Sequence, residues 1–223
     1  MSAFPLRVIK VGGSLFDFAA FPKAWSRWLA EQPPAVNVLI AGGGKLADVI
    51  READQAWGVG DEAAHWLAID VLAASARLLA AILKDARLEH DWERLLHRLA
   101  EREVGPPIVF CPVRFLQQRE ARFPPHPLPH GWSVTSDSIA ARIAGILDAD
   151  ELVMLKSADP PVPAQPPPGV APERAAGFRW RREGGADVSV RAGRCLHSRT
   201  AAGRRRSTTA IAGLRVSHGA FAG

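Results

Sequence analysis

A lysine followed closely by two glycines and a serine, Lys10-Val11-Gly12-Gly13-Ser14, has the composition of a phosphate-handling turn. Because glycines carry no side chains, backbone N–H groups could approach phosphate oxygens, and Lys10 would add a positive charge. In phosphoryl transfer the protein mainly positions reactants and neutralises charge, which suits a lysine held on a rigid strand. A glycine turn with a surface lysine is the alternative that five residues by themselves leave open.

A second glycine turn, Gly42-Gly43-Gly44, follows another apolar run. It predicts a second anion-binding turn, suited to the acceptor of a transferred phosphoryl group. Neither turn has the P-loop pattern G-x-x-x-x-G-K-[ST] or the dinucleotide pattern G-x-G-x-x-G, so these two kinds of site are excluded. Lys45 follows the second turn directly and is expected to face solvent.

The segment Thr135-Ser136-Asp137-Ser138 opens a predicted helix and supplies a carboxylate. Asp137 could cap the helix or hold lysine ammonium groups in position, and the segment alone favours capping. Lys156 ends a later apolar run and is a candidate for a second positive charge at the site.

Histidines and cysteines are weaker candidates. His65 lies in an apolar helical pattern, where a hydrogen-bonded core histidine is favoured over a substrate contact. His126 and His130 flank prolines in a loop and would bind metal only if other ligands converged on them. Cys111 and Cys195 are too few for a disulfide framework or a zinc site, so both are expected to be free thiols. No metal site built from side chains is predicted.

Short apolar runs alternate with helical patterns along the first 160 residues. Residues 6–11 and 36–41 are rich in β-branched residues and are closed by glycines, which indicates buried strands. Helical spacing of apolar residues is found in 21–31, 46–57, 61–83, a stretch capped by Asp91, and a stretch opened by Ser136, with further strands at 108–111 and 152–155. This alternation predicts an α/β fold, a three-layer α/β/α sandwich around a mainly parallel sheet.

The composition of the 223 residues, 48% of them hydrophobic, is sufficient for one buried core. The longest apolar runs are far shorter than the roughly 20 residues that cross a bilayer, so no membrane span is expected. The first residues lack the basic and apolar regions of a signal peptide. We therefore expect a cytoplasmic protein.

The net charge of +5 is distributed unevenly. Residues 1–172 hold 17 Lys plus Arg against 20 Asp plus Glu, whereas residues 173–223 hold 11 arginines, no lysine, and 3 acidic residues. We divide the chain into a core, 1–160, and a tail, 161–223, which begins proline-rich, becomes arginine-rich, and shows no period that would continue a sheet. We expect most of this tail to be exposed or disordered. A shifted reading frame after about residue 172 is the favoured explanation, and a basic tail for nucleic acid or anionic lipid is the alternative.

The order of these parts resembles the amino-acid-kinase superfamily, which includes the acetylglutamate, aspartate, carbamate and uridylate kinases. The order is strand-Lys-Gly-Gly, strand-Gly-Gly-Gly, Ser-Asp-Ser opening a helix, and a strand ending in Lys156. The resemblance runs from residue 7 to about residue 159. Within the superfamily, residues 64–69 and 131–138 are most similar to the furan-phosphate kinases of methanofuran biosynthesis.

The resemblance implies transfer of the ATP γ-phosphoryl group, with Mg²⁺, to the phosphate of an aminomethylfuran-methyl phosphate, which gives a diphosphate. It implies ATP binding by Lys10, Gly12, Gly13, Ser14 and Ser136, acceptor binding by Gly42, Gly43, Gly44 and His65, and catalytic roles for Lys10, Asp137 and Lys156. A different acceptor, such as an amino-acid carboxylate or a nucleotide, and a nucleotide-binding remnant without activity stay open. The implied partners are a small phosphate-bearing molecule and further copies of the chain.

The chain departs from the superfamily pattern after Lys156. Members usually have an Asp-x-Asp-Gly run there, whereas this chain has Ser157-Ala158-Asp159. The helix that packs against the adenine site and the closing pair of strands are also not recognisable in the sequence. The role of Lys156 and the ability to use ATP productively therefore depend on the structure.

Overall fold

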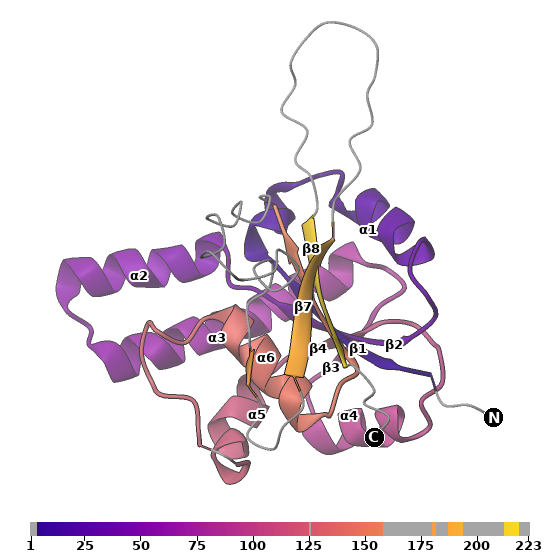
Figure 1. Cartoon of the computed structure of the whole chain (residues 1–223). Helices are drawn as coiled ribbons and strands as arrows, with labels where there is room; N and C mark the ends of the chain where they lie inside the picture. The colour runs from indigo at the N-terminus through magenta and orange to yellow at the C-terminus, as the bar shows by residue number, and fades with distance from the viewer. Residues whose placement is uncertain (1–3, 125, 158–179, 182–186, 194–211, 219–223) are drawn as a thin grey trace, which may run out of the picture.

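The structure is a computed structural model that describes residues 4–124, 126–157, 180–181, 187–193 and 212–218 (Figure 1). Its described strands form one eight-stranded sheet in the order β3-β4-β2-β1-β5-β8-β7-β6. The strands are β1 (Leu6–Val11), β2 (Val36–Ala41), β3 (Arg87–Glu89), β4 (Ile108–Phe110), β5 (Glu151–Lys156), β6 (Trp180–Arg181), β7 (Asp187–Gly193) and β8 (Ala212–His218). Neighbours among β1 to β5 are parallel, and β8, β7 and β6 continue the sheet in antiparallel fashion.

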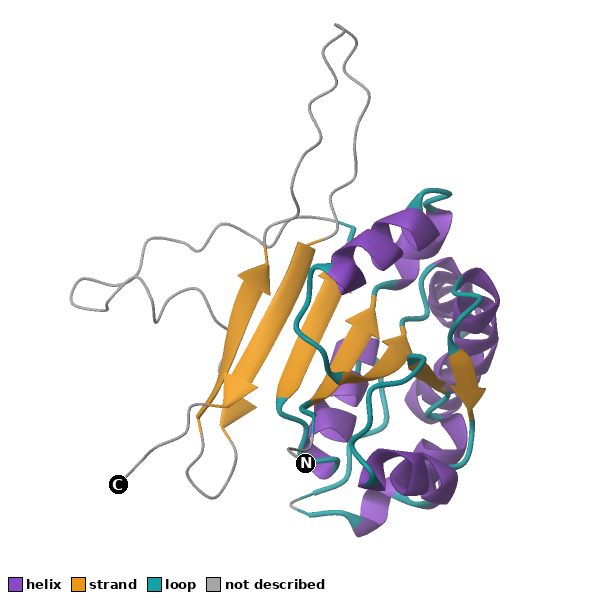
Figure 2. Ribbon diagram, turned by 90° about the vertical axis from the view of Figure 1, so that its right-hand side faces the viewer, coloured by secondary structure: helices purple, strands orange, loops and turns teal. Residues whose placement is uncertain are grey.

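Helices gather around the parallel part of the sheet, as Figure 2 shows. They are α1 (Phe21–Ala30), α2 (Lys45–Trp57), α3 (Asp61–Ile82), α4 (Trp92–Ala100), α5 (Val113–Gln118) and α6 (Ser136–Ile146), with short 3-10 helices η1 (Gly13–Asp17) and η2 (Glu120–Arg122). All residues of β1 and β2 are buried, which requires cover on both faces of these strands. The predicted α/β sandwich with a mainly parallel sheet is confirmed.

The register of the central strands brings three chain segments to one edge of the sheet. Val11 at the end of β1 lies opposite Ala41 of β2 and Leu155 of β5. The residues that follow, among them Gly12, Gly42 and Lys156, therefore leave the sheet side by side. The carboxyl ends of parallel strands are the usual place for ligands in open α/β sheets.

A buried polar cluster ties the same three strands together at their amino ends. Arg7 of β1 pairs with the carboxylate of Glu151 in β5, and its guanidinium also donates to the Asn37 side chain of β2 at 3.2 Å. Asn37 in turn donates to the carbonyl of Ala35 at 3.0 Å. Because the charged groups have partners, their burial is compatible with a stable core. These contacts hold the three strands in register at the end of the sheet opposite to the glycine turns.

Three features of the fold differ from the sequence analysis. The helix α5 was not predicted, and the short edge strand β3 was not recognised because two of its three residues are charged. The prediction that the tail does not continue the sheet is wrong for β7 and β8, since β8 pairs with all six residues of β5 and β7 pairs with β8. Backbone hydrogen bonds do not require long aliphatic runs, and both strands have a residue alternation of period two that was missed. The rest of the tail lies outside the described residues.

Helix α3 is long and apolar enough, by length and composition alone, to cross a membrane, with a mean hydropathy of 1.5 over its best window. Its inner face packs in the fold, however, where Ile69, Leu72 and Leu79 are buried and the helix contacts β2, β3 and β4. These contacts explain the apolar residues of the inner face. We therefore assign α3 to the core of the fold.

Candidate active site

The two glycine turns touch each other at the carboxyl edge of the sheet. A Cβ atom at Gly13 would lie 2.2 Å from the backbone nitrogen of Gly44, and one at Gly42 would lie 2.8 Å from that of Gly13. The turns are held on the strands by hydrogen bonds from the Gly12 and Gly42 N–H groups to the carbonyls of Leu155 and Val11, both at 2.8 Å. Glycine is therefore required here for a close approach of two backbones.

Lys10 is placed directly beneath these turns. It belongs to the central strand β1 and is only 4% exposed. Its Nζ lies 3.1 Å from the position that a Cβ of Gly42 would occupy. The predicted alternative, a surface lysine next to a glycine turn, does not describe this arrangement.

Asp137 faces the lysine and leaves the cap of α6 to another residue. Thr135 is the N-cap and accepts from the Ser138 N–H at 3.3 Å, while the Ser138 hydroxyl accepts from the Thr135 N–H at 3.4 Å. Asp137 Oδ1 instead lies 2.8 Å from Lys10 Nζ, and Asp137 Oδ2 accepts from Lys156 Nζ. The capping interpretation of Asp137 is wrong, because a reciprocal capping box makes its side chain free for other contacts.

One carboxylate thus stands between two ammonium groups. Burial lowers the pKa of Lys10, and so does the nearby charge of Lys156, although Asp137 opposes both effects. Burial alone would raise the pKa of Asp137, but the two lysines hold it below its usual value. Asp137 is therefore ionised at neutral pH, and the three groups together carry one excess positive charge.

Two serine hydroxyl groups and a further ion pair lie at the same end of the sheet. Ser14 and Ser157 share a hydrogen bond of 2.6 Å between their Oγ atoms. Lys45 extends into solvent, as predicted, and pairs with Asp17 of η1 at 3.0 Å. The Ser14 contact closes the first glycine turn against the end of β5, a link that only the folded chain could reveal.

The arrangement fits a polyphosphate anion. The glycine turns present backbone that no Cβ shields, and the lysine cluster is positively charged in excess. It does not fit a metal ion held by the protein, because both oxygens of Asp137 face ammonium groups. Among the described residues, no group of three or more His, Cys, Asp or Glu side chains could hold a metal.

Two predicted site residues lie near the cluster without a hydrogen bond or ion pair to it. Ser136 is the first residue of α6, next to Asp137. Gly43 is directed toward the helices, since its Cβ position is 2.6 Å from the Cβ of Ala47 and 3.7 Å from a methyl group of Val71. Their assigned roles in binding ATP and acceptor stay predictions.

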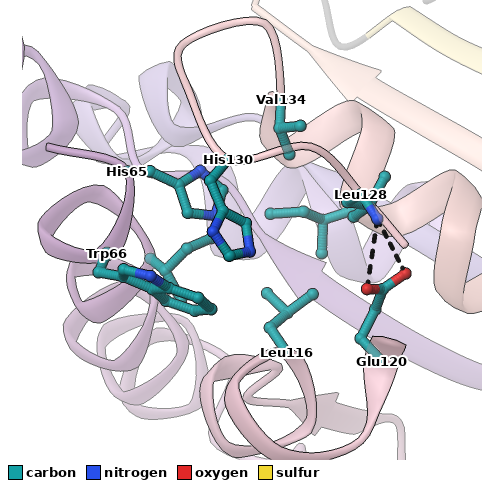
Figure 3. A pocket seen from close by; sticks show the side chains of 9 residues that line it. His65, Trp66, Leu116, Glu120, Leu128, His130 and Val134 are labelled. Carbon is teal, nitrogen blue, oxygen red and sulfur yellow. Dashed lines mark hydrogen bonds between the residues drawn. The ribbon is translucent and has the colours of Figure 1, made fainter. Parts of the chain in front are cut away.

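His65 belongs to a second cluster, shown in Figure 3. Its buried ring stacks on His130 at a centroid distance of 4.9 Å, and the Trp66 ring stands edge-on to both. Burial lowers the pKa of His65, partly offset by a hydrogen bond with the Gly131 backbone. These residues line a pocket with Leu128 and others, and the acceptor-binding role of His65 stays a prediction.

The cysteine prediction can be followed for one residue. Cys111 is buried at the end of β4 and is a free thiol, and burial raises its pKa. A buried thiol of raised pKa is a poor nucleophile, so Cys111 is structural. Cys195 lies outside the described residues.

The known proteins that are similar to this chain include two kinases. No protein-family model matches the chain. It is 26% identical over 155 residues to a (5-(aminomethyl)furan-3-yl)methyl phosphate kinase of Methanocaldococcus jannaschii. The matched residues are 69% of this chain and 67% of that protein. Among solved structures, a uridylate kinase of Archaeoglobus fulgidus is similar with a TM-score of 0.49 and 18% identity, over 73% of this chain and 68% of the other.

The sequence relative is a kinase, and the chain carries a lysine–aspartate–lysine cluster beneath two glycine turns on a parallel sheet. The order of these parts along the chain is the order that the superfamily pattern requires. In sequence and in the order of its parts, the chain thus resembles the amino-acid-kinase superfamily, and it is an ATP-dependent phosphotransferase.

Proposed function

We propose that the chain transfers the γ-phosphoryl group of ATP to the phosphate of an aminomethylfuran-methyl phosphate, giving ADP and a diphosphate. The observation that carries the kinase activity is the contact between two glycine turns above Lys10, Asp137 and Lys156. The acceptor is proposed from the name of the sequence relative. Synthesis of a methanofuran-type cofactor in the cytoplasm is the setting that this acceptor suggests.

The residues divide the work of phosphoryl transfer between positioning and charge neutralisation. The Gly13 N–H group, with the Ser14 hydroxyl, would hold the donor phosphates beside Gly12, and the N–H groups of Gly43 and Gly44 would hold the acceptor phosphate beside Gly42. The N–H groups of Gly12 and Gly42 themselves donate to strand carbonyls. Lys10 and Lys156 would neutralise the oxygens between which the phosphoryl group passes. Mg²⁺ would be bound by phosphate oxygens of the nucleotide and water, as is common for this ion.

Bond making and breaking balance without a covalent enzyme intermediate. An oxygen of the acceptor phosphate forms the new P–O bond, and the bond between the γ-phosphorus and the bridging oxygen of ADP breaks. The acceptor phosphate is already an anion at neutral pH, so no general base is needed. This agrees with a cluster whose only carboxylate is occupied by two lysines.

Turnover with a panel of acceptors tests the proposal. ADP release is measured for the full chain with ATP, Mg²⁺ and the furan phosphate, N-acetylglutamate, aspartate or UMP, and ³¹P NMR identifies the product. We expect a diphosphate signal that depends on the furan phosphate and disappears in Lys10→Ala. Faster turnover of another acceptor would replace the proposed substrate, and ATP binding without turnover of any acceptor would contradict the kinase activity.

We also propose that the chain forms a dimer through the outer faces of α2 and α3, which pack against each other (Figure 1). Apolar side chains on these faces are open to solvent, with Trp57 81% and Val49 60% exposed on α2, and Leu67 44% and Leu78 42% exposed on α3. An apolar surface shared by two helices is typical of an interaction site.

A second copy is the partner that the charges favour. Asp70 and Arg77 are exposed on α3, on either side of the exposed Ala74. When two such helices cross antiparallel at Ala74, each Asp70 lies opposite the Arg77 of the other copy, because seven residues make about two turns. Arg77 forms no salt bridge with any residue that the structure describes, so it is available for this pairing.

A further inference from the structure

The segment that precedes α6, residues 123–135, is fastened to the fold at its base. Buried Arg142 of α6 pairs with buried Glu120 at 2.6 Å and donates to the carbonyls of Phe123 and Pro124 at 2.6 and 2.9 Å. The Glu120 carboxylate also accepts from the Leu128 N–H at 3.3 Å (Figure 3). A segment of this length, without a helix or strand in its described residues 123–124 and 126–135, commonly has a function.

Beyond its base, the segment is joined to α3 through His130. The ring Nδ1 of His130 lies 2.7 Å from Oε2 of Glu62, and Oε1 of the same carboxylate accepts from the Trp66 indole N–H at 2.7 Å. The His130 ring stacks on His65, so one histidine contacts three side chains of α3. Hydrogen bonds from Trp66 first, and then from His130, lower the pKa of Glu62 and keep it ionised.

Two residues later, Trp132 joins the segment to α2. Its indole N–H donates to Asp54 Oδ2 at 2.7 Å, and the Arg51 guanidinium lies over its ring at 4.8 Å. The other carboxylate oxygen of Asp54, Oδ1, accepts from the Gly60 N–H at 3.0 Å. Between the two anchors, Gly131 has φ +148°, a backbone conformation that other residues rarely adopt.

The three elements joined here each lead to the site. Helix α2 begins at the second glycine turn, and α3 lies against that turn through Val71. Helix α6 begins four residues after Trp132 and carries Asp137 in its first turn. The segments 64–69 and 131–138, which the sequence singles out for their subfamily resemblance, thus meet in space.

We propose that Trp132 and His130 are positioning residues for phosphoryl transfer, acting through Asp54 and Glu62. They hold the start of α6, and with it Asp137, against the helices that carry the second glycine turn. This inference rests on the proposed function in one respect, namely that this turn binds the acceptor. It predicts that loosening the segment slows the reaction of the acceptor and leaves ATP binding intact.

The test removes one hydrogen bond at a time. Trp132→Phe keeps a ring for Arg51 and loses the indole N–H, Asp54→Ala loses the acceptor oxygen, and Asp54→Asn keeps an oxygen. The matched control is Trp28→Phe, since Trp28 lies on α1, away from the segment and from every proposed binding surface. Steady-state kinetics with the furan phosphate give kcat and KM for both substrates, and calorimetry gives the Kd of a non-hydrolysable ATP analogue.

We expect kcat over KM for the acceptor to fall about tenfold in Trp132→Phe and Asp54→Ala, in line with the loss of one charge-assisted hydrogen bond. The double variant should be no slower than the slower single variant, Asp54→Asn should recover most of the rate, and the Kd of the ATP analogue should change less than twofold. Additive losses, equal losses for ATP and acceptor, or a loss matched by Trp28→Phe would overturn the positioning role.

Hydrogen exchange separates failure of this inference from failure of the proposed function. Amides of residues 133–139 should exchange faster in Trp132→Phe than in wild type or Trp28→Phe, whether or not any acceptor is turned over. If no acceptor is found and these amides still lose protection, the proposed acceptor is wrong, but the inference that Trp132 holds the start of α6 is supported. If the exchange of these amides is unchanged in Trp132→Phe, the inference that Trp132 holds the start of α6 is wrong.

Discussion

Replacing Asp137 by asparagine tests the centre of the site, because it removes one charge and keeps the shape of the side chain. The pKa of Asp137 is held below its usual value by the two lysines, against the effect of burial, so the carboxylate is ionised at any pH near neutrality. The stabilisation that its charge provides is present above the ordinary carboxyl pKa and is lost only as the pH falls through the lowered value. At neutral pH the substitution therefore leaves two ammonium groups without their counter-charge.

The magnitude follows from the geometry. Two unit charges about 4 Å apart attract by about 4 kcal/mol at an effective dielectric constant of 20. Lys10 is buried, but the side chains of Asp137 and Lys156 are 35% and 41% exposed, so solvent screens part of this attraction. We expect the free energy of unfolding to fall by about 2 kcal/mol, which lowers Tm by roughly 4–8 °C for a chain of this size.

Activity and ATP affinity should change in opposite directions. We expect kcat to fall by about 10² to 10³, the usual cost of losing one preorganised electrostatic element, because Lys10 and Lys156 are no longer held in place. The Kd of a non-hydrolysable ATP analogue should stay the same or decrease, since its phosphates supply the negative charge that the lysines lack. Calorimetry, a coupled ADP assay and thermal unfolding measure the three quantities on the same preparation.

Asp17→Asn is the matched control, because Asp17 pairs with the exposed Lys45 at the same end of the sheet. A surface pair of this kind contributes about 0–1 kcal/mol, so stability and rate should hardly change. A kcat within threefold of wild type in Asp137→Asn would refute the organising role of Asp137. Weaker ATP binding by tenfold or more would refute the view that the carboxylate and the phosphates compete for the same lysines.

Further predictions concern the lysine, the glycines and the dimer. Burial first, and then the charge of Lys156, lower the pKa of Lys10, so activity should decline at a pH below the ordinary lysine value of 10.5. Because arginine keeps its charge at higher pH, the alkaline decline in the pH profile of Lys10→Arg should move to higher pH. Gly13→Ala should reduce turnover at least 100-fold, since no space exists for its Cβ, whereas Gly145→Ala in α6, with open space around it, should raise stability by about 0.5–1 kcal/mol in thermal unfolding. Light scattering should find a dimer in wild type, a monomer in Arg77→Asp, and a dimer again when Asp70→Arg is added; a wild-type monomer would exclude the proposed interface.

The alternation of strands and helices in the first 160 residues was predictable because buried parallel strands consist of short apolar runs. Residues 6–11 and 36–41 are strands with the predicted bounds, and every residue in them is buried. The short strand β3 was not predictable in this way, since Arg87 and Glu89 reduce its apolar content. Its place at the edge of the sheet depends on pairing with β4, which no local pattern shows.

At the site, the residue types were predictable and their contacts only partly so. Two functions of Asp137 were left open, and the choice depends on Thr135, whose hydroxyl caps α6. The spacing of Thr135 and Ser138 could have indicated a capping box, although serine replaces the more usual Glu or Gln at its third position. The contact of Ser14 with Ser157 joins residues 143 positions apart, so it follows from the sheet register alone.

The tail shows why loss of helical period does not by itself exclude a strand. Residues 187–193 alternate Val188 and Val190 with polar neighbours, and residues 212–218 alternate Leu214 and Val216 in the same way. A period of two over five residues is sufficient for an antiparallel pair, because the backbone supplies the hydrogen bonds. The division into a core, 1–160, and a tail remains a proposal, as does the shifted reading frame, which an in-frame resequenced gene through Gly223 would exclude.

The two lysines differ because their strands differ in position. Lys10 lies on β1, between β2 and β5, and is buried beneath backbone that carries no side chains. Lys156 is the last residue of β5, with a side chain 41% exposed, and reaches Asp137 from the rim of the cluster. A buried ammonium group can be held only where a counter-charge is fixed, and a single carboxylate on the first turn of α6 meets both lysines. We therefore expect Lys10 to fix the transferring group and Lys156 to meet the charge that develops at the open side, so that one aspartate sets the geometry of both.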